Sequence, residues 1–89
     1  MDIELARRTI RDPRASFVDH YEAAARLTSS SDSTTDDLIE CLRRGGICSE
    51  IAATTLYVRT NRPRADDSIL SLNVDADDWI AYLRKMGQP

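Results

Sequence analysis

The chain has 89 residues, of which 42% are hydrophobic and 30% charged, the balance of one folded domain rather than of a disordered chain. Its 15 acidic and 12 basic residues give a net charge of −3, which speaks against a protein whose main task is to neutralise phosphate groups. No apolar run reaches the roughly 20 residues that span a bilayer, and residues 1–15 hold no apolar block typical of a secretion signal. We therefore expect a single domain over 1–89 that is cytoplasmic and does not engage a membrane.

The first 28 residues predict an N-terminal helical arm made of two helices. Residues 2–11 repeat apolar side chains at helical spacing, which places them on one face of a short helix. That face consists of Ile3, Ala6 and Ile10. The pair Asp12-Pro13 ends this pattern, because a proline disfavours helical geometry in the residue before it.

A second and longer helix is expected over residues 13–28. Asp12 suits the position of its N-cap, and Pro13 suits its first turn. We expect a broad apolar face of this helix to turn toward the core. Two overlapping sets fit that face, namely Phe17, Tyr21, Ala24 and Ala25, or Val18, Tyr21 and Ala25.

A polar loop is predicted over residues 29–35, within the run TSSSDSTT that starts at Thr28. Small hydroxyl and carboxylate side chains hydrogen-bond their own backbone and compete with helix formation. The loop should therefore be exposed, and it divides the arm from a helical body over residues 36–89.

The body opens with a helical hairpin over residues 36–60, hinged at Gly45-Gly46. Apolar residues at the spacing of one helical face define its first helix. They are Leu38, Ile39 and Leu42. Either glycine can adopt the left-handed conformation that ends a helix, and so few connecting residues make the two helices packed neighbours.

Capping residues are found at the expected N-terminus of each helix in this hairpin. The candidate capping-box pairs of the first helix combine Ser33 or Thr34 with Asp36 or Asp37. Ser49 is the candidate cap of the second helix. The apolar stripe expected there is Ile51, Thr55 and Val58, flanked by Ala52 and Leu56.

Two cysteines, Cys41 and Cys48, lie on either side of the glycine turn. A disulfide framework is typical of small secreted domains with more cysteines than this. We therefore predict two free, buried thiols.

The C-terminal helix has the clearest start signal in the chain. Asp75 can cap it with Asp78 three residues on, while Val74 and Trp79 occupy the two positions of a hydrophobic staple. Its expected inner face is Trp79, Ile80, Leu83 and Met86, and Gly87 should end it. The preceding residues 68–74 fit neither strand nor helix periodicity, and we interpret them as a helical turn or an extended connector. All these elements predict an all-α fold, a compact bundle of four to five short helices.

No constellation of residues predicts catalysis. The only soft metal ligands, His20, Cys41 and Cys48, lack the paired spacing of a zinc site. His20 has no nucleophile at a diagnostic spacing, and three glycines cannot build a phosphate-binding loop. We therefore expect no metal, no cofactor and no enzymatic activity.

The hairpin permits a helix-turn-helix interpretation, in which its second helix would read DNA. Aligned on Gly46, that helix would present four residues to the groove: Ser49, Glu50, Ala53 and Thr54. The nucleic-acid-binding residues in this alternative are Arg59, Arg62 and Arg64. Glu50 would meet phosphates unfavourably, and the arginines follow only at the far end.

Acidic residues gather near the C-terminus, in a stretch from 65 to 78 without a basic residue. They are Asp66, Asp67, Asp75, Asp77 and Asp78, and we predict that they contact a protein partner. A second acidic run consists of Asp32, Asp36, Asp37 and Glu40. If these groups converge in space, they suit a partner with a basic surface.

The functional hypothesis is therefore a small, non-enzymatic, acidic protein that acts by binding another protein. Small acidic domains of this kind include phage and mobile-element inhibitors of bacterial nucleic-acid machinery, anti-CRISPR proteins among them, and this is the narrower form of the hypothesis. The alternative is a helix-turn-helix DNA-binding or transcriptional regulatory protein. The sequence leaves the oligomeric state open.

Overall fold

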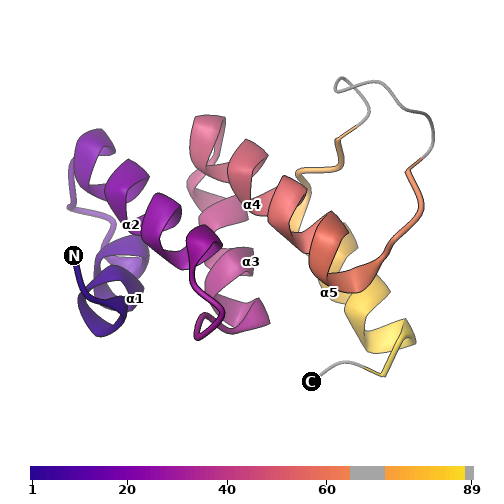
Figure 1. The fold of residues 1–89 in the computed structure, drawn as a ribbon. Helices are drawn as coiled ribbons and strands as arrows, with labels where there is room; N and C mark the ends of the chain where they lie inside the picture. The colour runs from indigo at the N-terminus through magenta and orange to yellow at the C-terminus, as the bar shows by residue number, and fades with distance from the viewer. Residues whose placement is uncertain (65–71, 88–89) are drawn as a thin grey trace.

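The computed structural model describes residues 1–64 and 72–87. Within these ranges the chain forms five helices and no strand, which confirms the all-α prediction (Figure 1). The helices are α1 (Ile3–Arg11), α2 (Phe17–Ser29), α3 (Thr35–Arg44), α4 (Gly46–Thr60) and α5 (Ala76–Lys85). The predicted conformation of residues 68–74 falls largely outside the described residues.

The helices pack as two neighbouring hairpins with α5 added at one end. Helix α1 lies along α2, α3 lies along α4, and α2 crosses onto α4 to join the hairpins. Helix α5 packs against α3 at the opposite end from α1 and α2 (Figure 1). The radius of gyration of 12.5 Å is close to the roughly 12 Å expected for a compact chain of this length.

One hydrophobic core joins all five helices. The side chains that α1, α2 and α4 contribute to this core are mostly small. Five of them are fully buried alanines: Ala6, Ala23, Ala24, Ala52 and Ala53. Small side chains let helix backbones approach closely, while larger residues fill the remaining space. The largest of these are Trp79, Ile10, Leu27, Leu38 and Leu56.

Helix α3 begins and ends as the sequence predicts. The Thr34 hydroxyl accepts a hydrogen bond from the Asp37 backbone, and the Asp37 carboxylate accepts one from the Thr34 backbone. Gly45 and Gly46 both have positive φ, at 76° and 54°, so the chain turns there at little conformational cost. The predicted helix, Gly-Gly, helix hairpin is confirmed.

Helix α2 begins later than predicted. Its N-cap is Ser16, whose hydroxyl accepts a hydrogen bond from the Asp19 backbone, and Asp12 instead ends α1. The predicted apolar face of α2 is also largely wrong. Ala23, Ala24 and Leu27 are buried, whereas Phe17, Val18 and Tyr21 are exposed.

Helix α4 begins earlier than predicted, because Gly45 takes the N-cap position instead of Ser49. Ser49 is buried within the helix, and its hydroxyl donates a 2.6 Å hydrogen bond to the Gly46 carbonyl. The predicted stripe through Val58 is wrong, since Val58 is 74% exposed. The buried face instead runs through Cys48, Ala52, Ala53, Leu56 and Tyr57.

The polar loop between α2 and α3 is not the fully exposed connector that its composition predicts. Ser30 and Ser33 are buried under the side chain of Arg59 from α4. The Arg59 guanidinium donates to the Ser30 carbonyl at 2.6 Å, and to the carbonyl and hydroxyl of Ser33 at 2.9 and 2.8 Å. A side chain distant in sequence thus provides the hydrogen-bond donors that allow this loop to be buried.

Helix α5 is anchored by Trp79, which is fully buried as predicted. Its indole N–H donates to the Asn73 carbonyl at 2.7 Å, and its ring meets Tyr57 of α4 edge to face at 4.9 Å between centroids. Leu83 is buried with it, but Met86 is exposed, because the helix ends at Lys85.

Candidate functional site

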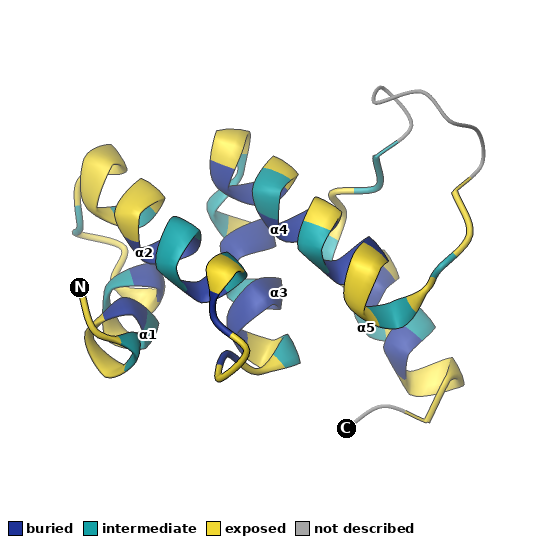
Figure 2. Ribbon diagram, in the orientation of Figure 1, coloured by how far each residue is buried: buried dark blue, intermediate teal, exposed yellow. Residues whose placement is uncertain are grey.

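An exposed apolar surface on α2 is the most distinctive feature of the described residues. Phe17 is 67% exposed, Val18 60% and Tyr21 41%, and we call these three residues the α2 strip. In Figure 2 the outer side of α2 and its first turn are exposed, while its inner side is buried. Phe17 and Tyr21 lie four residues apart and Val18 and Tyr21 three apart, so the three side chains are neighbours on the helix.

The orientation of α2 follows from its two apolar faces. Ala23, Ala24 and Leu27 lie on the side that meets α1 and α4, where alanines permit close backbone approach. The larger side chains of the α2 strip lie beside this contact surface and remain exposed. A helix can bury only one side in a two-layer packing, and here the side with the smaller residues is buried.

The surroundings of the α2 strip are polar and partly acidic. Asp19 and Glu22 are exposed on the same helix, and neither takes part in an ion pair among the described residues. Met1 reaches the same surface, where it borders a shallow depression with Tyr21. An apolar centre with a polar edge is the usual arrangement of a protein-binding surface.

The structure describes three of the five aspartates that the sequence grouped as a partner-binding set, and all three lie at the start of α5. Asp66 and Asp67 lie outside the described residues. Asp75 caps α5 by accepting hydrogen bonds from the Asp77 and Asp78 backbones at 2.9 and 3.4 Å. Asp78 forms a 2.8 Å ion pair with Arg62, and this contact lowers the pKa of its carboxyl. Asp77 is exposed and carries no ion pair among the described residues.

The three arginines predicted for nucleic-acid binding are engaged with the protein itself. Arg59 holds the loop between α2 and α3 through the hydrogen bonds to Ser30 and Ser33. Arg62 stacks on two aromatic rings, 4.6 Å from the centroid of Trp79 and 4.4 Å from that of Tyr82. Arg64 lies 5.1 Å above the ring of Tyr57.

The four residues that the helix-turn-helix interpretation assigns to the DNA groove differ in their exposure. Ser49 and Ala53 are buried in the core, at 4% and 0% exposure, whereas Glu50 and Thr54 are exposed. A buried side chain cannot reach a base edge, so α4 cannot present these four residues together in that register. This part of the interpretation is wrong because α4 is the helix onto which both α2 and α3 pack.

Both cysteines are free and buried, which confirms the prediction for them. Burial raises the pKa of the Cys41 thiol to about 12, and the neighbouring Cys48 adds to the effect. Burial likewise raises the pKa of Cys48. Since the thiolate is the reactive form, neither residue is poised as a nucleophile.

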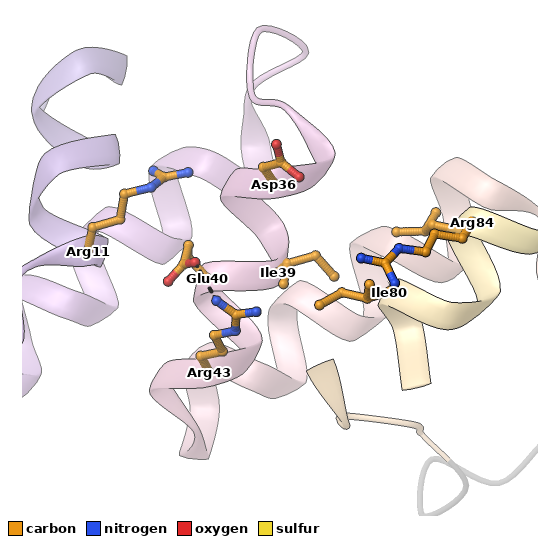
Figure 3. Close-up of a pocket in the computed structure, with 8 residues that line it drawn as sticks. Arg11, Asp36, Ile39, Glu40, Arg43, Ile80 and Arg84 are labelled. Atoms are coloured by element: carbon orange, nitrogen blue, oxygen red, sulfur yellow. Dashed lines mark hydrogen bonds and ion pairs between the residues drawn. The ribbon is translucent and has the colours of Figure 1, made fainter. Parts of the chain in front are cut away.

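A groove of about 470 Å³ opens between α1, α3 and α5. Figure 3 shows its lining, which combines an apolar floor with charged side chains from all three helices. The floor consists of Ile39, Ile80 and Leu83, and the charged residues are Arg11, Asp36, Glu40, Arg43 and Arg84. No local pattern in the sequence indicates this groove, because its residues come from three helices that are far apart along the chain.

Comparisons with protein-family models, with curated proteins and with solved structures find no match to this chain. In the part of the chain that the structure describes, no helix has both the length and the apolar character needed to cross a membrane. The geometry of the α2 strip is therefore the strongest indication of function. The sequence analysis placed Phe17, Val18 and Tyr21 in the core. The signal that it missed is that α2 carries apolar residues on two sides, of which one had to face outward.

Proposed function

We propose that this protein acts without catalysis, by binding another protein through the α2 strip. The observation that carries this proposal is the exposure of Phe17, Val18 and Tyr21 side by side on one helix. Single exposed apolar residues are common on any protein, but two aromatic rings with an adjoining valine form a continuous surface. Aromatic side chains are enriched at the centres of protein interfaces, because each buries a large area with few rotatable bonds.

The charges beside the α2 strip indicate the kind of partner. Asp19 and Glu22 are exposed on the same helix and can face lysine or arginine side chains at the rim of an apolar groove. Rim charges mainly accelerate association and select among partners, while the buried apolar contacts provide most of the affinity. The proposed partner thus has an apolar groove bordered by basic residues.

The acidic C-terminal segment is the second contact region in this proposal. Residues 1–64 carry ten acidic and ten basic residues, so the whole net charge of −3 comes from residues 65–89. Of the described aspartates there, Asp77 is the one not committed to a cap or an ion pair. The narrower hypothesis of an inhibitor of bacterial nucleic-acid machinery fits such a basic partner, and it is supported by small size and acidity alone.

The α2 strip can be tested with a matched pair of variants. Val18→Glu and Val58→Glu make the same change at two helical valines that are 60% and 74% exposed. Tagged wild type and both variants would be incubated with a lysate of the source cells, and bound proteins quantified by mass spectrometry. We expect Val18→Glu to reduce the recovery of specific partners at least about tenfold, as a charge at an interface centre does. Val58→Glu should retain them.

Equal melting temperatures of the three proteins would show that folding is unaffected. Retention of the same partners by Val18→Glu would contradict the proposal. A fluorescence titration with duplex DNA at two salt concentrations would test the alternative directly. Tight, strongly salt-dependent DNA binding that is lost on changing Arg64, with no protein partner recovered, would favour a nucleic-acid function instead.

A further inference from the structure

A groove of about 680 Å³ lies between the first half of α4 and residues 72–74, which lead into α5. We call it the α4 groove, and its walls are mainly aliphatic, with four such side chains in the lining: Ile47, Ile51, Leu72 and Val74. Ile47 is 42% and Val74 41% exposed, so apolar surface remains there for a ligand to cover. The volume falls within the usual range of ligand sites.

The wall opposite α4 is held in place by hydrogen bonds to the core. The Asn73 backbone N–H donates to the Tyr57 hydroxyl at 3.2 Å, and the Asn73 carbonyl accepts the Trp79 indole N–H at 2.7 Å. Both aromatic side chains are buried. Leu72 and Val74, on either side of Asn73, are therefore held beside α4 before any ligand binds, so binding costs little conformational entropy there.

The charge of the α4 groove is negative. Among the described residues of its lining Glu50 alone is charged, and its carboxylate has no ion pair or hydrogen bond with the rest of the described chain. The hydroxyls of Ser49 and Thr54 are used within α4, where they donate to the carbonyls of Gly46 and Glu50 at 2.6 and 3.0 Å. The amino end of α4 carries a partial positive charge, but this effect fades within the first turn, and Glu50 lies in the second. A cation therefore suits this groove, whereas an anion does not.

From these observations we propose that the α4 groove binds a peptide segment of a partner in which an aliphatic side chain adjoins a lysine or arginine. The aliphatic side chain would cover Ile47 and Val74, and the cation would pair with the Glu50 carboxylate. An exposed ion pair contributes little free energy, so the apolar contact provides most of the affinity and Glu50 selects the sign of the ligand's charge. The net charge of −3 favours the approach of such a segment.

The α4 groove and the α2 strip share no residue, so this inference does not depend on the proposed function. Val58, the control position in the test of the α2 strip, does not line the groove either. Each site can therefore be disabled without changing the other.

The test is a titration of ¹⁵N-labelled protein with the dipeptide N-acetyl-Leu-Lys-amide, followed by NMR chemical shifts. We expect shifts centred on Ile47, Glu50 and Val74, with a dissociation constant of roughly 1 mM for so small a probe. N-acetyl-Leu-Gln-amide, which lacks the charge, should bind about threefold more weakly. N-acetyl-Gly-Lys-amide, which lacks the apolar side chain, should bind at least about fivefold more weakly.

Two matched variants complete the test. Glu50→Gln should bind the Lys and Gln dipeptides equally, whereas Glu4→Gln, at an exposed position on α1 outside the groove, should keep the threefold preference for lysine. Equal binding of the two dipeptides by the wild type, or an unchanged preference in Glu50→Gln, would overturn the proposal. So would shifts centred on the α2 strip, or no shift at about 10 mM dipeptide, ten times the expected dissociation constant, as would follow if another segment of the chain already filled the groove.

Discussion

Asp37 links the start of α3 to α1. Its side chain is 2% exposed and accepts a 3.0 Å hydrogen bond from Arg7 Nε and a 2.9 Å contact from Arg11 Nη2. It also accepts the Thr34 backbone N–H at 2.8 Å, so one carboxylate serves a cap and two ion pairs. A charge so deeply buried is tolerated only when all its oxygens are satisfied, as they are here.

These contacts determine how Asp37 responds to pH. Burial by itself raises the pKa of Asp37, but the hydrogen bonds from Thr34, Arg7 and Arg11 outweigh it and hold the pKa below its usual value. A carboxyl with a depressed pKa in the folded state stabilises the protein fully above its unfolded pKa of about 3.9. This contribution is lost as the pH falls through the lower, folded pKa.

The variant Asp37→Asn tests this role of the carboxylate. At pH 7 we expect it to lower the free energy of unfolding by about 2 kcal/mol, because the cap and both ion pairs are weakened. The difference from wild type should shrink below about pH 4, as the wild-type carboxyl takes up a proton. Urea denaturation at several pH values measures both effects. Asp36→Asn, at the adjacent exposed position, is the control and should change stability by less than about 0.5 kcal/mol. A difference between Asp37→Asn and wild type that does not change with pH would contradict the depressed pKa.

At the scale of elements, α5 is held to the bundle by side chains more than by close backbone packing on α4. Arg62 follows the end of α4 and lies over the rings of Trp79 and Tyr82 while pairing with Asp78. Cation–π contacts with a partly desolvated arginine are stronger than exposed ones. Arg62, one of the three arginines that the sequence suggested for DNA binding, thus holds the last helix in place.

We therefore predict that Arg62→Gln destabilises the protein by about 1–2 kcal/mol. The loss should appear as a lower unfolding midpoint in urea, together with changed near-ultraviolet circular dichroism from Trp79. Arg8→Gln, at an exposed position on α1, is the matched control and should have little effect. Wild-type stability in Arg62→Gln would mean that α5 is held by its apolar contacts alone.

At the scale of the whole molecule, one core spans the N-terminal arm and the body. The polar loop between α2 and α3 does not separate them, because Arg59 holds the loop and α2 packs directly on α4. A core of this size has little redundancy, and its largest member is Trp79.

Trp79→Ala should accordingly cost about 3–5 kcal/mol and unfold much of the population at moderate temperature. Phe17→Ala removes an aromatic ring of the exposed α2 strip and should change stability by less than about 0.5 kcal/mol. Thermal unfolding followed by far-ultraviolet circular dichroism distinguishes the two. Similar losses in both variants would contradict the assignment of Phe17 to the surface.

The sequence alone determined the features that depend on neighbours in the chain. The capping box of Thr34 and Asp37, the Gly45-Gly46 turn and the Asp75 cap of α5 are local hydrogen-bonding and backbone effects. They are encoded within a few residues, and the all-α class follows from them together with the helical periodicity of the apolar residues. The free, buried cysteines follow from composition in the same way.

Only the tertiary structure decided which side of each helix is buried. Helix α2 has apolar residues on two sides, and periodicity cannot choose between Phe17 with Tyr21 and Ala23 with Leu27. The choice depends on how closely α2 approaches α4, a distance set by side chains on both helices. The burial of Ser30 by Arg59 and the groove that α3 and α5 line together have the same origin, since each joins residues that only the packed fold brings together.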